Sequence, residues 1–175
     1  NHYGADYKGC NHDYNTEGTN QIDECVHLIK NDPTSRRIVF TAWNPSELSK
    51  MVLAPCHNLF QFYVRNGTLD GQLYQRSADL MLGVPYNILS YSLLLFIFAR
   101  FCGLKAGKLK IVFGDVHIYS EHLEGAKEQI SRTPQEFPKV NINCDPNTAI
   151  RDYQLNHFEF INYNPQPNIK MKMIA

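Results

Sequence analysis

Apolar residues recur at helical spacing in three stretches of the chain. Residues 21–30 carry an apolar stripe that ends at Asn31-Asp32-Pro33, a typical helix stop. Residues 88–103 are apolar on nearly every side, which predicts a buried central helix with Gly103 as its C-cap residue. Residues 120–132 predict a third and more polar helix.

Runs rich in β-branched and aromatic residues predict the strands. Residues 59–64 and 68–75 flank Arg65-Asn66-Gly67, and an Asn-Gly pair between two such runs is a strong hairpin signal. Further strands are expected at residues 38–43, 108–114, 140–143 and 157–160. Strand pairs mixed with helices predict an α+β fold, with a mixed β-sheet packed with the buried central helix in a single domain, residues 1–175.

Composition narrows the class of protein. The 175 residues are 43% hydrophobic, enough for one domain with a sizeable core, and 17 basic residues balance 17 acidic ones. Nucleic-acid-binding surfaces usually carry a basic excess, so no nucleic-acid partner is expected. The longest apolar run, residues 93–98, is too short to span a bilayer, so no membrane partner is expected either.

Five cysteines without a C-x-x-C spacing argue against a disulfide framework or a zinc module. Reduced thiols in an intracellular protein are therefore expected, and we assign the chain to the cytoplasm. The sequence does not open with Met or with a leader pattern, so we expect it to begin inside a longer product.

Cys56 is the first candidate for chemistry, because it stands in Ala54-Pro55-Cys56-His57 just ahead of a predicted strand. A thiol becomes a strong nucleophile where nearby cations stabilise its thiolate. The alternative is a buried structural cysteine, the commoner state of a free thiol. Neighbouring residues on a strand face opposite sides, so His57 need not act on Cys56.

Arginine, serine and carboxylate side chains follow the next strand. Arg76 and Ser77 together suit a phosphate, and Asp79 suits an N–H of a heterocycle, although a surface Arg–Asp pair is equally compatible. Arg36 and Arg37 precede another strand, where they are either solvated charges or two guanidinium groups that grip a phosphate.

Two more clusters allow two interpretations each. Asn87 precedes the apolar helix, so its amide either caps that helix or reads the edge of a base. Asp115, His117 and Tyr119 share one face of a strand, where they form either an internal polar network or a contact to a ligand hydroxyl. No Cys or carboxylate pattern makes His117 and His122 a metal site.

Taken in order, these motifs resemble the thymidylate synthase family. The similarity covers essentially the whole chain and is most specific between Pro55 and Asn87. The motifs that carry it are Ser35-Arg36-Arg37-Ile38, Ala42-Trp43-Asn44, Ala54-Pro55-Cys56-His57, Gln72-Leu73-Tyr74-Gln75-Arg76-Ser77, Leu82-Gly83-Val84-Pro85, His117-Ile118-Tyr119 and Tyr163-Asn164-Pro165.

The resemblance implies reductive methylation of deoxyuridylate (dUMP) at C5 to give dTMP. The co-substrate 5,10-methylenetetrahydrofolate supplies both the carbon and the hydride, and no metal is implied. Cys56 matches the nucleophile that adds to C6 of uracil, which makes C5 nucleophilic in turn. The catalytic residues implied are Cys56, His57, Arg76, Asp79 and Asn87.

The resemblance also implies the binding residues and a homodimer. Arg36 and Arg37 match the pair that reaches the nucleotide of the partner subunit. The residues implied to hold dUMP are Arg36, Arg37, Gln75, Arg76, Ser77, Asn87, His117 and Tyr119. Those implied to contact folate are Asp79, Leu82, Gly83, Tyr86 (usually Phe in the family) and Ala175.

Chains of the family extend considerably further at the N-terminus, where they carry a Glu central to proton transfer and Trp residues that pack on folate. We therefore expect a domain that is incomplete at its N-terminus, with little or no activity as an isolated fragment. Two alternatives stay open: a non-catalytic nucleotide-binding or dimerisation module of the same fold, and a deoxyuridylate hydroxymethylase in which water replaces the hydride.

Overall fold

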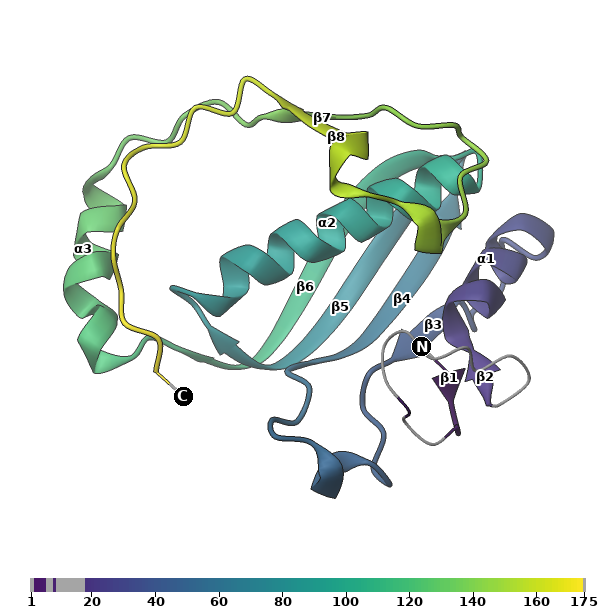
Figure 1. Ribbon diagram of the computed structural model, residues 1–175, viewed down its shortest axis with the longest axis horizontal. Coiled ribbons are helices and arrows are strands. Elements are labelled where there is room, and N and C mark those ends of the chain that lie inside the picture. Colours follow the sequence, from purple (N-terminus) through teal and green to yellow (C-terminus); the bar gives the residue numbers. More distant parts are fainter. Residues whose placement is uncertain (1, 6–7, 9–17, 175) are drawn as a thin grey trace.

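A four-stranded sheet forms the centre of the computed structural model, which describes residues 2–5, 8 and 18–174. The strand order is β3-β4-β5-β6 (Figure 1). The antiparallel strands are β3 (Val39–Thr41), β4 (His57–Arg65) and β5 (Thr68–Asp79). β6 (Lys105–His117) runs parallel to β5, and α2 (Gly83–Phe101) makes the crossover between them. The expected α+β fold with a mixed sheet is confirmed.

The β4–β5 hairpin forms as its turn residues predict. Asn66 and Gly67 have φ angles of 49° and 71°, the left-handed region that a tight two-residue hairpin turn requires and that Asn and Gly tolerate best. This turn sets the pairing Arg65↔Thr68, and alternation then sends Phe60 and Phe62 to the same face of the sheet.

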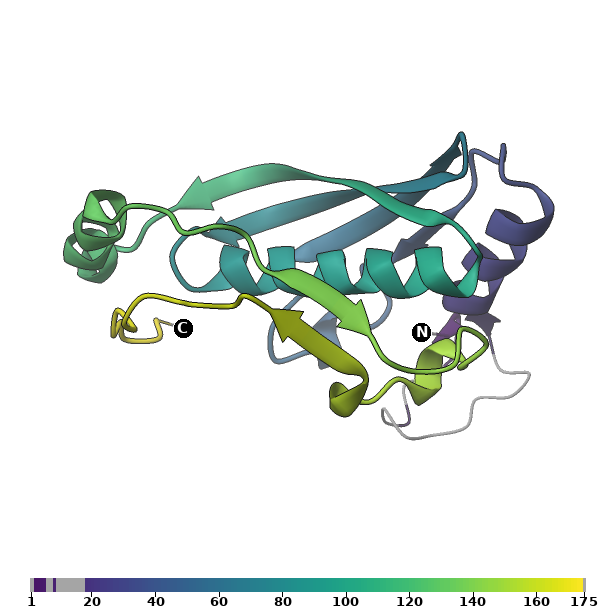
Figure 2. The ribbon, with the colours of Figure 1, turned by 90° about the horizontal axis from the view of Figure 1, so that it is seen from above.

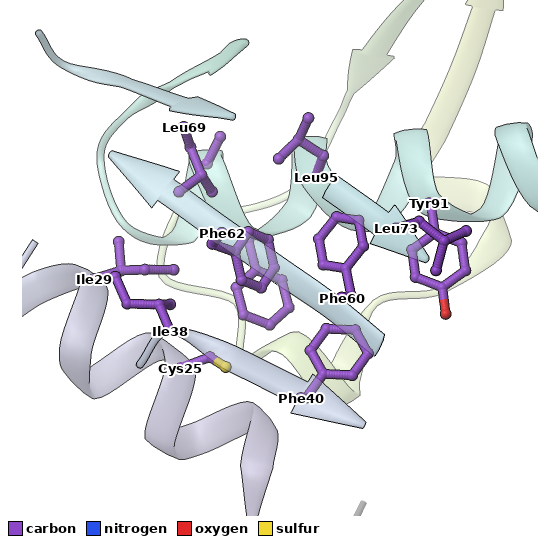
Figure 3. Close-up of a cluster of buried hydrophobic side chains, with 12 residues drawn as sticks. Cys25, Ile29, Ile38, Phe40, Phe60, Phe62, Leu69, Leu73, Tyr91 and Leu95 are labelled. Carbon is purple, nitrogen blue, oxygen red and sulfur yellow. The ribbon is translucent and has the colours of Figure 1, made fainter. Parts of the chain in front are cut away.

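That face carries the core (Figure 3). Phe62 stacks on Phe98 of α2 with ring centroids 4.6 Å apart, and Phe60 packs on Tyr91 at 5.0 Å. On the same face, α1 (Gln21–Asn31) adds Cys25 and Ile29 to this cluster. Burial of each large apolar side chain contributes about 1.5–3 kcal/mol, so these rings fix α2 against the sheet.

The central helix differs from its prediction in two ways. It begins at Gly83 rather than 88, so Asn87 lies inside the helix and is not its cap. The Asp79 carboxylate instead accepts hydrogen bonds from the backbone N–H groups of Met81 and Leu82, at 3.1 and 3.4 Å. The helix is also not buried all round, because Tyr86, Leu89 and Phe96 are exposed in the part of the chain that the structure describes.

By length and apolar composition α2 would suffice to cross a membrane, and its buried residues in this structure are Val84, Tyr91, Leu95, Phe98 and Ala99. The remaining elements surround the sheet (Figure 2). They are β1 (His2–Tyr3), β2 (Thr19–Asn20), η1 (Leu48–Lys50), η2 (Ser120–His122), α3 (Leu123–Ser131), β7 (Lys139–Ile142), η3 (Ile150–Asp152), η4 (Leu155–His157) and β8 (Phe158–Ile161). Residues 162–174, here called the C-terminal segment, run back beside α3 (Figure 1).

Candidate active site

Arg76 holds the loop that carries Cys56. Its Nε donates to Pro55 O at 2.9 Å and one Nη donates to Ala54 O at 2.8 Å. The same Nη lies 3.9 Å from the Cys56 sulfur. The Arg76 backbone N–H donates to Cys56 O at 2.8 Å. The backbone and the side chain of Arg76 therefore both bond to this loop. The guanidinium thus places a positive charge beside the Cys56 sulfur.

A β-bulge in β4 changes the face of the sheet to which His57 points. His57 pairs with Gln75 while Leu59 pairs with Tyr74, so Asn58 is an extra residue in β4. The bulge turns His57 to the face that carries Gln75, and the Asn58 side chain accepts from the Arg76 backbone N–H at 3.1 Å. Among the described residues, the His57 ring makes no hydrogen bond to Cys56.

His57 bonds instead to the central helix. Its Nδ1 lies 2.8 Å from the Tyr91 hydroxyl. Burial lowers the pKa of His57 below its ordinary value and raises the pKa of Tyr91 to about 12. Both groups are therefore uncharged near neutral pH, and the pair is a neutral hydrogen bond that ties the start of β4 to α2.

Gln75 and Asn87 form an ordered amide pair. Gln75 is 1% exposed, and its Nε2 donates to Asn87 Oδ1 and to Ser77 O, each at 3.0 Å. Because the Asn87 oxygen is held as an acceptor, its amide nitrogen is left as a directed donor. Gln75 Oε1 is buried and has no hydrogen-bond partner among the described residues, so it can accept a further donor.

The ends of β5 and β6 bring the remaining polar residues together. Their parallel register places Ser77 opposite Asp115 and Asp79 opposite His117. His117 Nδ1 lies 2.9 Å from Asp115 Oδ1, and its ring packs edge-on against Tyr119 with centroids 5.1 Å apart. The expected polar cluster of Asp115, His117 and Tyr119 is therefore present as an internally bonded group with His117 still partly exposed.

The residues expected to contact folate gather where β5 turns into α2. Leu82 and Gly83 follow the Asp79 turn, and a Cβ on Gly83 would lie 3.4 Å from that of Asp79. Tyr86 is 72% exposed, one turn further along α2. Ala175 lies outside the described residues.

Arg36 and Arg37 are not brought to this site. They are exposed in the turn before β3, where Arg36 O accepts from Gln61 Nε2 at 3.3 Å. The β3–β4 register, extended beyond Val39↔Gln61, places Arg37 next to Tyr63. Tyr63 is about seven strand residues, or roughly 23 Å, from Cys56. One ligand bound at Cys56 therefore does not reach both arginines of the same chain.

Three contacts were not expected from the sequence. The Arg76 guanidinium lies over the Trp43 ring, 5.6 Å from its centroid. Asn58 forms the bulge and Tyr91 anchors His57. Tyr91 is one of several polar residues in a largely apolar helix and was only weakly marked, whereas no local pattern marks Asn58. Within the described ranges, no three His, Cys, Asp or Glu residues form a group that could hold a metal ion.

A cysteine next to a guanidinium, beside ordered amides and a polar cluster at the strand ends, defines a thiol-based site suited to a polar heterocyclic ligand. Residues 1–175 match the family model described as thymidylate synthase. The chain belongs to the thymidylate synthase family.

Curated relatives agree with this assignment. The chain is 47% identical to a bifunctional dihydrofolate reductase-thymidylate synthase of Paramecium tetraurelia, covering 98% of this chain and 37% of the relative. It is 45% identical to a thymidylate synthase of varicella-zoster virus and 44% identical to that of Saccharomyces cerevisiae, covering 98% of this chain in each case and 57% and 59% of the relatives. The chain thus spans about a third to three fifths of the length of these relatives.

Proposed function

We propose that the protein carrying this chain is a thymidylate synthase that methylates dUMP at C5 with 5,10-methylenetetrahydrofolate as co-substrate. The carrying observation is the Arg76 guanidinium, 3.9 Å from the Cys56 sulfur and fixed by two backbone carbonyls. The Cys56 sulfur beside it adds to C6 of uracil, so that C5 gains the electron density to attack the folate-borne carbon. The loop carbonyls hold Nε and one Nη, which leaves the other Nη of Arg76 for a phosphate oxygen next to Ser77.

The amide pair supports uracil as the base. Gln75 donates to Asn87 Oδ1 and so directs the Asn87 NH₂ outward as a donor. Uracil presents a carbonyl acceptor at C4, whereas cytosine presents an amino donor there, which would meet another donor. His117 and Tyr119 suit the deoxyribose hydroxyl, and the Asp79 carboxylate suits N–H groups of the pterin.

The reaction is tested by release of tritium from dUMP labelled at C5, using the whole protein with methylenetetrahydrofolate. We expect release that is abolished in Cys56→Ser and retained in Cys144→Ser, a half-buried free cysteine elsewhere in the fold. Binding of dUMP without release would refute the proposal in favour of a non-catalytic module. A product heavier than dTMP by one oxygen would instead identify a hydroxymethylase.

We also propose that the protein works as a homodimer in the cytoplasm, where Cys56 stays reduced. The distance between Cys56 and the Arg36–Arg37 pair supports sites completed by a second subunit. The sheet face opposite α2 supports a surface for it, because Leu59, Tyr63 and Tyr74 are 42%, 62% and 45% exposed there.

Subunit complementation tests this arrangement. Cys56→Ser and the double variant Arg36→Ala/Arg37→Ala should each be inactive alone. When the two are mixed and allowed to exchange subunits, half of the dimers carry one intact site, so about a quarter of wild-type activity should return. No recovery, with exchange confirmed by mass spectrometry, would refute the shared site.

A further inference from the structure

His122 is a fully buried polar side chain to which the proposed function assigns no role. It is 0% exposed and ends η2, directly before α3. Its Nε2 lies 2.7 Å from the backbone oxygen of Lys172 in the C-terminal segment. A carbonyl oxygen only accepts, so Nε2 carries the hydrogen and donates it. Nδ1 makes no hydrogen bond to any described residue, yet it lies 4.0 Å from the Asp79 carboxylate.

The His122 ring stands where three parts of the site meet. Its imidazole packs edge-on against Tyr119, with centroids 5.6 Å apart, and Tyr119 packs in the same way on His117. On a second side it faces Asp79 at the end of β5. On the third it holds Lys172. One side chain therefore lies beside Tyr119 of the proposed sugar-binding pair, the proposed folate carboxylate and the C-terminal segment.

Other contacts of the C-terminal segment lead to α3 and the loop after it. Arg132 donates to Pro167 O at 2.6 Å, and Gln166 donates to Thr133 O at 2.6 Å. Met171 packs so closely on Gly125 that a Cβ there would lie 2.9 Å from its sulfur. These contacts hold the segment against α3, whereas the His122 contact connects it to the end of β5.

We propose that His122 is a positioning residue that couples the seating of the C-terminal segment at Lys172 to the orientation of the Asp79 carboxylate. A buried imidazole with one nitrogen bound has a single ring orientation, and here that orientation aims Nδ1 at Asp79. Nδ1 without a hydrogen only accepts, and so does the carboxylate, so the two attract each other only where a proton lies between them. That shared proton would satisfy a buried nitrogen that otherwise makes no hydrogen bond. The consequence for folate binding rests on the function proposed above, whereas the consequence for the segment does not.

The rate of trypsin cleavage after Lys172 measures how firmly the C-terminal segment is bound, because the Lys172 carbonyl bound by His122 is the carbonyl that trypsin attacks. In the whole protein, His122→Phe keeps a ring in the cavity and removes the hydrogen bond. Cleavage after Lys172 should then accelerate about fivefold, the effect of one hydrogen bond on local opening. His122→Gln retains an amide donor and should restore much of the protection. The control is His27→Phe, an exposed α1 residue whose side chain bonds only to Asn31 among the described residues.

Steady-state kinetics measure whether the contact between His122 and Lys172 affects folate binding at Asp79. His122→Phe should raise the KM for methylenetetrahydrofolate several-fold more than it changes the Kd for dUMP. Unchanged trypsin cleavage in a folded His122→Phe variant would overturn the proposal. So would faster cleavage with an unchanged folate KM, because the segment would then be independent of Asp79. If even the wild-type protein lacks activity, the proposed function fails while the trypsin result still stands.

A second variant keeps the test valid if His122→Phe does not fold. Gly125→Leu adds a side chain where Met171 packs, which displaces the segment while His122 stays in place. Leu is also a better helix former than Gly, so α3 is not weakened. Faster cleavage after Lys172 together with a higher folate KM is expected. Faster cleavage without a KM change would refute the coupling.

Discussion

Replacement of Gln75 by Glu is the sharpest single test of the amide network. The two side chains have almost the same shape, but Gln75→Glu exchanges the NH₂ donor for an acceptor. Both groups that this NH₂ meets, Ser77 O and Asn87 Oδ1, are acceptors at 3.0 Å. The variant therefore loses two hydrogen bonds and places a carboxyl at a site that is 1% exposed.

Loss of two buried hydrogen bonds costs about 1–3 kcal/mol, and burial of an unpaired carboxyl adds to this. We expect a loss of about 3 kcal/mol in the free energy of unfolding at pH 7 for Gln75→Glu. Burial would raise the pKa of the new carboxyl above about 4.3, its value in the unfolded chain. The loss therefore grows as the pH rises through that value and shrinks in acid, where the protonated carboxyl donates one bond.

Urea denaturation at pH 7 and pH 4.5, followed by the fluorescence of Trp43 and by circular dichroism, measures this effect. Trp43 is the only tryptophan of the chain and lies beside Arg76. The matched control is Gln129→Glu at an exposed position of α3, which should change stability by no more than about 0.5 kcal/mol. A loss below about 1 kcal/mol at pH 7, or a loss that grows in acid, would contradict the network.

Three further predictions concern the core and the neighbouring histidine. Gly71→Ala would place a Cβ 2.4 Å from Phe60, so we expect a loss of about 1–3 kcal/mol in urea denaturation. Phe62→Ala leaves a cavity under Phe98 and should cost about 3–5 kcal/mol in the same assay; a loss below about 1 kcal/mol would mean that the stacked pair does not hold α2. Burial lowers the pKa of folded His57, so the unfolded chain binds the proton first and stability falls as the pH drops below about 6.5. His57→Gln should flatten this decline between pH 7 and pH 5.5, and an unchanged slope would mean that other groups cause it.

Local signals in the sequence predicted the elements well where one short pattern determines them. Asn66-Gly67 specified the hairpin turn, and the stripe of residues 21–30 specified α1. The end of β5 was placed at residue 75, whereas the strand continues to Asp79. That extension depends on parallel pairing with β6, some forty residues away, which no local pattern reveals.

The same distinction applies to the site. Cys56 and Arg76 were both expected, and the structure brings them together through the β4–β5 pairing. The partner of His57 was not found, because it depends on the bulge and on a helix more than thirty residues further along. The resemblance to the family named Asn87 as a site residue, but its local position suggested a helix cap. Only the true start of α2 separates the two roles.

The extra residue in β4 bears on which changes of length the hairpin tolerates. Insertions at the exposed Asn66–Gly67 turn lengthen a loop and leave the pairing above it intact. Deletion of Asn58 does not leave the pairing intact, because it removes the bulge and shifts Cys56 and the loop before it relative to Arg76, whose backbone N–H donates to Cys56 O. It also removes the side chain that accepts from the Arg76 backbone. Sequences that vary freely at the turn should therefore keep an unchanged number of residues between Cys56 and the core position of Phe60.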